Sequence, residues 1–213
     1  MKGTRVDPAV FLTDQACLLR KAPSGENHLL LAFFLRETGL KYALARKATS
    51  SGGTPALPDL FEWGELRMEQ KDPARPAFLR EFMRKRGFPG IARDFRTLRA
   101  ASRLALFYER NLQHMESFPE AWNLLLTALE NLSEKRKPEA VLLKALFLFA
   151  RNEGYAVRAH WLAQLRKAWR GDVARVLQDP VEACTADPAQ LDDWIHDLCR
   201  FFAQETDLLP PEK

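Results

Sequence analysis

The side chains that could do chemistry in this sequence are mostly bases, and they gather in one stretch. Residues 71–103 contain ten Lys or Arg against three Asp or Glu, a net charge of +7, whereas residues 178–213 contain two against nine, a net charge of −7. Clustered bases attract phosphate regardless of nucleotide sequence, and the attraction weakens as salt rises. The first stretch therefore indicates an anion-binding surface, although a solvated helix face would have the same composition.

Motifs for covalent chemistry are missing from the sequence. It has no G-x-x-x-x-G-K-[ST] loop, no G-x-G-x-x-G, no H-E-x-x-H and no G-x-S-x-G. Asp193 and His196 would share a helix face, but two ligands without a third are more often a surface contact than a metal site. Cys17, Cys184 and Cys199 are too widely spaced for a zinc motif, so we expect three small buried side chains. We expect no enzyme, no cofactor and no metal.

Length and composition indicate a folded protein outside the membrane. With 213 residues, 46% hydrophobic and 28% charged, the chain can form one large or two small domains with real cores. The start, MKGTRVDPAVF, lacks the apolar segment of a signal peptide, and no run reaches the roughly 18 apolar residues of a membrane span. We therefore expect a cytoplasmic location and no membrane partner.

The first third of the chain reads as short strands joined by turns. Within residues 28–47, two apolar runs flank ETG, where Gly39 suits the positive φ of a hairpin loop; a single long helix is the alternative. Residues 48–59 are expected to form a flexible loop. Five strands within about 80 residues predict a small closed barrel. The expected strands are VFLTDQACLLRK, LLLAFFLR, LKYALARK, LFEWGELRMEQ and AFLREFMRK.

The rest of the chain has helical periodicity. Residues 91–112 form an amphipathic pattern with arginines on its polar face, and residues 117–132 open with a capping box. Residues 138–154 are apolar on nearly every side, which is typical of a helix in the middle of a bundle. Residues 187–205 begin with the capping residue Asp187 and predict a final helix.

Candidate nucleic-acid contacts follow from this layout. Phe33, Phe34, Tyr42 and Trp63 could stack on bases, although aromatic side chains more often fill a core. Charge reversal at Arg84, Lys85 and Arg86 is expected to weaken DNA binding and to reduce its salt dependence. The predicted phosphate contacts are Lys41, Arg46, Lys47, Arg80, Arg84, Lys85, Arg86, Arg93, Arg96, Arg99 and Arg103.

Three segments resemble the bacterial recombination mediator RecO. SGENHLLLAFFLRETGLKYALARKATS and LPDLFEWGELRME are similar to its N-terminal OB-fold, and LLKALFLFARNEGYAV is similar to a family helix that ends in a glycine and aromatic signature. The order of barrel, basic helix, apolar helix and terminal helix also agrees. The resemblance implies an α+β protein, with a five-stranded OB-fold β-barrel at residues 1–88 and an all-α helical domain at residues 89–213.

The resemblance also implies a function and partners. RecO proteins bind single- and double-stranded DNA, anneal complementary strands, displace or remodel single-strand-binding protein, and load recombinase together with RecR. The family binds the acidic, apolar C-terminal tail of single-strand-binding protein in its helical domain. By position, the candidates here are Leu142, Leu143, Lys144 and Phe147, although Lys144 could simply extend from a buried helix to solvent.

The sequence departs from the family in two places. RAHWLAQLRKAW lacks the four-cysteine zinc module that many RecO proteins carry there, so no zinc role is expected. The family's Lys-Gly-Ala-Arg motif is replaced by RKATS, which leaves Arg46 and Lys47 as its nearest equivalents.

A second hypothesis is a non-enzymatic adaptor whose basic face binds an acidic protein. A titration with labelled oligonucleotides would separate this adaptor hypothesis from the DNA-binding one.

Overall fold

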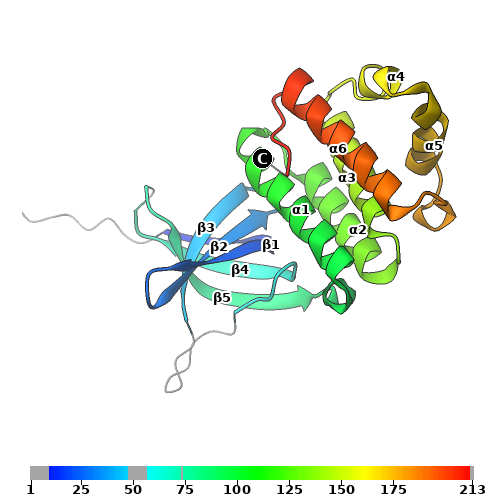
Figure 1. The fold of residues 1–213 in the computed structure, drawn as a ribbon. Helices are drawn as coiled ribbons and strands as arrows, with labels where there is room; N and C mark the ends of the chain where they lie inside the picture. Colours follow the sequence, from blue (N-terminus) through cyan, green and yellow to red (C-terminus); the bar gives the residue numbers. More distant parts are fainter. Residues whose placement is uncertain (1–9, 48–56, 73, 212–213) are drawn as a thin grey trace, which may run out of the picture. The chain divides into compact units, whose positions relative to one another are not determined.

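The computed structural model describes residues 10–47, 57–72 and 74–211, and the chain divides into two compact units. The first comprises residues up to Gly87 together with Met115–Phe118, and the second comprises Phe88–His114 and the residues from Pro119 onward. The α+β class is confirmed, with five strands before six helices in the described residues (Figure 1). Of the loop expected at residues 48–59, residues 48–56 lie outside the described residues.

The five strands of the first unit form a single sheet that closes on itself in the order β1-β2-β3-β5-β4. All neighbouring strands are antiparallel except β3 and β5, which are parallel. The two-strand interpretation of residues 28–47 is therefore correct, and Gly39 has the expected positive φ of 74°. The strands are β1 (Val10–Ser24), β2 (His28–Leu35), β3 (Gly39–Arg46), β4 (Trp63–Gln70) and β5 (Ala77–Arg86).

Alternation along the strands builds the core of this unit. Leu31 and Phe33 of β2, Ala43 of β3 and Leu66 of β4 point inward and are almost completely buried. Phe34 points to the opposite side but is also fully buried, because Phe118 packs edge-on against its ring at 6.3 Å. Residues 115–118 thus cover part of the sheet, which the sequence pattern did not predict.

The second unit is a helical bundle arranged around α3 (Figure 1). α3 is buried on nearly every side, as predicted, and contacts α1, α2, α5 and α6. Phe107 of α1 lies 4.9 Å from Phe149 of α3 and 5.7 Å from Phe202 of α6, between ring centroids. The helices are α1 (Phe95–Asn111), α2 (Pro119–Glu134), α3 (Pro138–Asn152), α4 (Trp161–Gln164), α5 (Lys167–Gln178) and α6 (Pro188–Glu205).

Two helix starts show how local sequence sets the boundaries. The predicted cap of α6 is confirmed, since the Asp187 carboxylate accepts a hydrogen bond from Gln190 N at 2.8 Å. α1 begins later than predicted, because Pro89–Arg93 form a short 3-10 helix and Asp94 then caps α1 by accepting from Thr97 N at 2.9 Å. Arg93 therefore lies before α1 rather than on it.

Candidate nucleic-acid interface

The outer side of the closed sheet carries a row of partly exposed apolar side chains. Leu30 of β2 pairs with Ala22 of β1 and with Leu44 of β3, and Leu44 pairs in turn with Phe78 of β5. Their sequence neighbours Leu31, Ala43 and Ala77 belong to the core, so alternation places the row on the opposite side. Each of the four row residues is partly exposed. The row is therefore an apolar surface in reach of solvent.

Polar and aromatic side chains flank this row on both sides. Arg20 and Tyr42 both pair with Ala32, which places them on the same side of the sheet next to the row. On the other side of the row, Arg46 pairs with His28 and is exposed, with no ion pair among the described residues. We call the following residues the outer face: Arg20, His28, Leu30, Tyr42, Leu44, Arg46 and Phe78.

The outer face is free of carboxylates on its two central strands. The outward positions of β2 are His28, Leu30, Ala32 and Phe34, and those of β3 are Leu40, Tyr42, Leu44 and Arg46. Glu26 lies in the turn before β2. Aromatic rings beside arginines, with no acidic groups between them, can stack bases and neutralise phosphates.

The other two residues predicted on or after β3 lie differently. Lys41 is exposed, but it pairs with the core residue Phe33, so alternation directs it to the opposite side of the strand from Tyr42. The ammonium group of Lys47 donates to Glu26 O at 2.7 Å and to Gly25 O at 3.3 Å. Lys47 therefore holds the β1–β2 turn, beside the outer face.

The bases predicted on β5 are largely neutralised by β4 and the residues before it. Arg80 forms an ion pair with Glu69, Arg84 with Glu62 at 2.9 Å, and Lys85 with Glu65 at 2.9 Å. The hydrogen bond from Arg80 is the main reason why the pKa of Glu69 lies below its ordinary value. A phosphate would have to displace these carboxylates.

Two of the four aromatic residues predicted to stack on bases are buried, and two are partly exposed. Phe33 and Phe34 are fully buried and cannot stack on a base, so the core interpretation holds for both. Tyr42 and Trp63 are partly exposed, and Tyr42 lies on the outer face. Phe78, which the sequence analysis did not single out, is the second partly exposed aromatic residue of the outer face.

The arginines of α1 are engaged within the helical unit. Arg96 donates to both carboxylate oxygens of Glu139 in α3, at 2.8 and 2.7 Å. Arg99 and Arg103 both approach Asp192 of α6, at 3.6 and 3.2 Å, and the Arg103 side chain is only 11% exposed. A phosphate at this arginine face would have to compete with these carboxylates, and for Arg99 and Arg103 the competing carboxylate belongs to the acidic stretch of the same chain.

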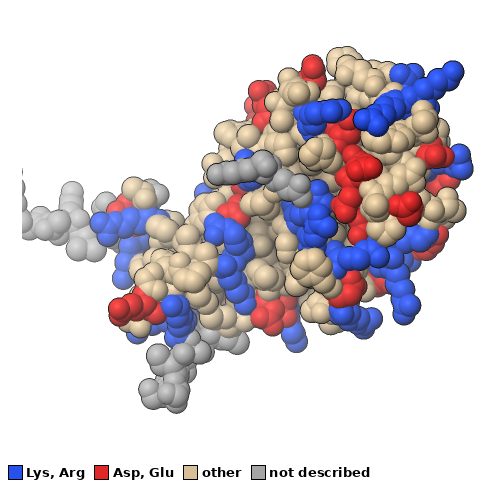
Figure 2. Space-filling view, viewed as in Figure 1, with Lys and Arg blue, Asp and Glu red and all other residues tan. Residues whose placement is uncertain are grey.

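The surface view agrees with this internal pairing. Figure 2 shows basic and acidic atoms interleaved over the helical unit, with acidic atoms running beside the basic ones. A net charge of +7 over residues 71–103 therefore overstates the charge available to a partner. Arg93 is an exception among the described residues, since it is exposed and has no ion pair there.

The residues predicted to bind a partner tail belong to the helical core. Leu142 and Leu143 are fully buried and Phe147 is 6% exposed, with its ring 6.1 Å from that of Trp161. A partner cannot reach these apolar side chains, because α3 is covered on nearly every side. Lys144 donates to the carbonyls of Val176, at 2.9 Å, and Asp179 at the end of α5, and burial lowers its pKa.

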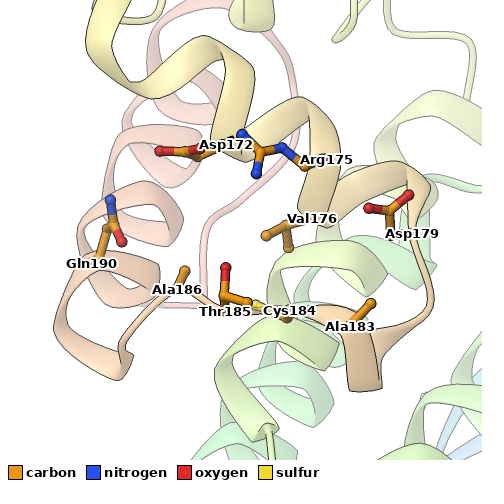
Figure 3. Close-up of a pocket in the computed structure, with 9 residues that line it drawn as sticks. All are labelled: Asp172, Arg175, Val176, Asp179, Ala183, Cys184, Thr185, Ala186 and Gln190. Atoms are coloured by element: carbon orange, nitrogen blue, oxygen red, sulfur yellow. Dashed lines mark hydrogen bonds and ion pairs between the residues drawn. The ribbon is translucent and has the colours of Figure 1, made fainter.

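A pocket of about 190 Å³ lies beside these carbonyls (Figure 3). Side chains of α5 and of the connection to α6 line it, with Val176 and Cys184 among the apolar ones. Its charged side chains are Asp172, Asp179 and Arg175, and Arg175 donates to Asp172 at 3.0 Å. The surplus of carboxylates makes this pocket a poor fit for an acidic tail.

Cys17, Cys184 and Cys199 are all buried thiols, as predicted, and burial raises the pKa of Cys17. In the described part of the chain, no three His, Cys, Asp or Glu side chains are placed to hold a metal ion. None of the described helices combines the length and the apolar character that a membrane crossing requires.

Sequence reasoning found Tyr42 and Arg46 but missed most of the outer face. Leu30, Leu44 and Phe78 were not singled out, because only the strand register brings them into one row. The sequence signal that could have found them is the two-residue alternation along each strand, which separates inward from outward positions.

No protein-family model matches this chain, and no curated protein matches it significantly.

Proposed function

We propose that this protein binds nucleic acid on the outer face of an OB-fold barrel and acts as a recombination mediator of the RecO type. The observation that carries the proposal is the outer face, whose β2 and β3 positions carry no carboxylate and where the partly exposed aromatic residues Tyr42 and Phe78 lie in or beside a row flanked by arginines. Stacking on such side chains contributes about 1–3 kcal/mol per base and tolerates any base.

The strand arrangement supports the OB-fold assignment. An OB-fold is a five-stranded barrel whose β2–β3 surface binds oligonucleotides. Here the sheet order β1-β2-β3-β5-β4 places β2 and β3 side by side, with β5 parallel to β3. The centre of the outer face lies on this β2–β3 surface, with Arg20 of β1 and Phe78 of β5 at its sides.

The proposed biological role is DNA repair by strand annealing and recombinase loading. Annealing needs no active site, because basic groups reduce the repulsion between two strands and base pairing then provides the driving force. A mediator of this type binds single- and double-stranded DNA in the cytoplasm and contacts RecR and the acidic tail of single-strand-binding protein. Since Leu142, Leu143 and Phe147 are buried, we assign that tail no surface on α3.

The test is oligonucleotide binding by fluorescence anisotropy at low and moderate salt. Arg46→Ala and Tyr42→Ala should each weaken binding about tenfold, and Arg46→Ala should also reduce the salt slope. Arg84→Ala is the matched control on β5, because Glu62 already neutralises that guanidinium. If the wild-type protein binds no oligonucleotide but captures an acidic protein, the adaptor hypothesis replaces this proposal.

A further inference from the structure

A second pocket, of about 340 Å³, lies within the helical unit. It is bounded by the 3-10 helix before α1, the first turn of α1, the end of α2 and the start of α3. Four cationic side chains line it, against two carboxylates. The cations are Arg93, Arg96, Lys135 and Arg136, and the carboxylates are Asp94 and Glu134.

The charges of this pocket are not equally available. Arg96 is held by Glu139, and Lys135 by Glu182. Arg93 and Arg136, in contrast, are both exposed and form no ion pair with any described residue. Two guanidinium groups thus border a single cavity with their charge still available.

The two carboxylates also differ. Asp94 accepts hydrogen bonds from Thr97 N at 2.9 Å and from Thr97 Oγ1 at 2.7 Å, so its negative charge is already engaged in capping α1. Glu134 is exposed at the last residue of α2 and has no ion pair within the described residues. Glu134 is therefore the group that would repel an anion entering the pocket.

The wall of the pocket is fixed by a close backbone contact. Gly90 N donates to Ser133 Oγ at 3.0 Å, and a Cβ atom at Gly90 would overlap the carbonyl oxygen of Ser133. The Ser133 hydroxyl accepts that bond and keeps its own proton to donate. α3 begins beside it at Pro138, and no side chain caps its first turn. The positive end of the α3 dipole adds to the attraction for anions.

We infer that this pocket binds a phosphate group, held by Arg93 and Arg136. Guanidinium groups bind phosphate through charge-assisted, often paired hydrogen bonds. The source of the phosphate rests on the proposed function: it is a backbone phosphate of a nucleic-acid strand. The helical unit then has a phosphate contact of its own, made by other residues than those of the outer face.

The first experiment titrates the full chain with inorganic pyrophosphate and follows the phosphorus NMR signal. Arg93→Ala and Arg136→Ala should each weaken binding about tenfold. Glu134→Gln should strengthen it severalfold, because it removes the repulsive charge and leaves the shape. Arg158→Ala, an exposed arginine away from the pocket, is the control and should have no effect. Equal pyrophosphate affinity in the wild type and in the Arg93→Ala/Arg136→Ala double variant would overturn the inference.

The second experiment identifies the source of the phosphate. In oligonucleotide titrations at several salt concentrations, the double variant should lower the logarithmic salt slope by about 0.7 per lost contact with a single strand. If pyrophosphate binding falls while this slope is unchanged, the pocket takes free phosphate and the nucleic-acid source is refuted. If Arg46→Ala and Tyr42→Ala leave oligonucleotide binding intact but the pocket variants still lose pyrophosphate, the proposed function fails and the pocket stands.

Discussion

Replacing Asp192 by Asn tests whether arginines of the basic stretch stabilise the helical unit through ion pairs with Asp192. Asp192 lies on α6 and meets both Arg99 and Arg103 of α1. The Asp192→Asn variant keeps the shape of the side chain and one acceptor oxygen but removes the charge. If the pairing stabilises the helical unit, the variant should unfold more easily.

The expected magnitude follows from the exposure of the two arginines. Breaking a fully buried ion pair costs about 3–5 kcal/mol, whereas an exposed pair contributes about 0–1 kcal/mol. The Arg103 side chain is 11% exposed, Arg99 is 50% exposed and Asp192 is 35% exposed. We therefore expect a loss of about 2 kcal/mol in the free energy of unfolding, with Arg103 accounting for most of it.

Tryptophan fluorescence during urea denaturation measures this loss in the helical unit. Four of the five tryptophans lie in the helical unit, and Trp194 on α6 is fully buried two residues from Asp192. Arg99→Ala is the control and should cost less than about 1 kcal/mol. An unchanged urea midpoint for Asp192→Asn would refute the internal role.

Two further predictions concern backbone conformation and pH. Gly39 and Gly25 both have positive φ, but of the two only Gly39 would bring a Cβ atom against a neighbour, 2.5 Å from Phe118 Cζ. In urea denaturation, Gly25→Ala should therefore lower the free energy of unfolding by about 1 kcal/mol and Gly39→Ala should lower it clearly more. Equal losses in the two variants would contradict the Phe118 contact. Hydrogen bonds from the Thr97 hydroxyl and then from the Thr97 amide hold the pKa of Asp94 below its ordinary value. The charged Asp94 carboxylate therefore stabilises α1 above about pH 4, and this stabilisation is lost as the pH falls through the lowered pKa. Asp94→Ala should cost about 1 kcal/mol at pH 7, and a loss that does not shrink in acid would contradict this assignment.

Much of the fold could be predicted because its signals are local. Turn residues at Gly25 and Gly39, the two-residue alternation of β3 and the Asp187 cap of α6 each act within a few residues. Even so, the 3-10 helix at Pro89–Arg93 displaced the start of α1, because a periodic pattern does not show where a cap interrupts it.

The site was harder to predict because its charges are matched at long range. Asp192 is 89 residues away from Arg103, so counting charges in a window gives no sign that the two neutralise each other. Phe33 and Phe34 are neighbours on opposite sides of β2: Phe33 points into the core, and Phe118 packs against Phe34. Which aromatic residues reach solvent therefore depended on a segment far along the chain.

Photo-cross-linking to a single-stranded oligonucleotide tests the central claim most directly. Ultraviolet irradiation of the bound complex, followed by mass spectrometry of the peptides, identifies the side chains that touch the bases. Our account predicts cross-links at Tyr42 and Phe78, the aromatic residues of the outer face. Cross-links confined to peptides outside β2, β3 and β5, with none at Tyr42 or Phe78, would contradict it.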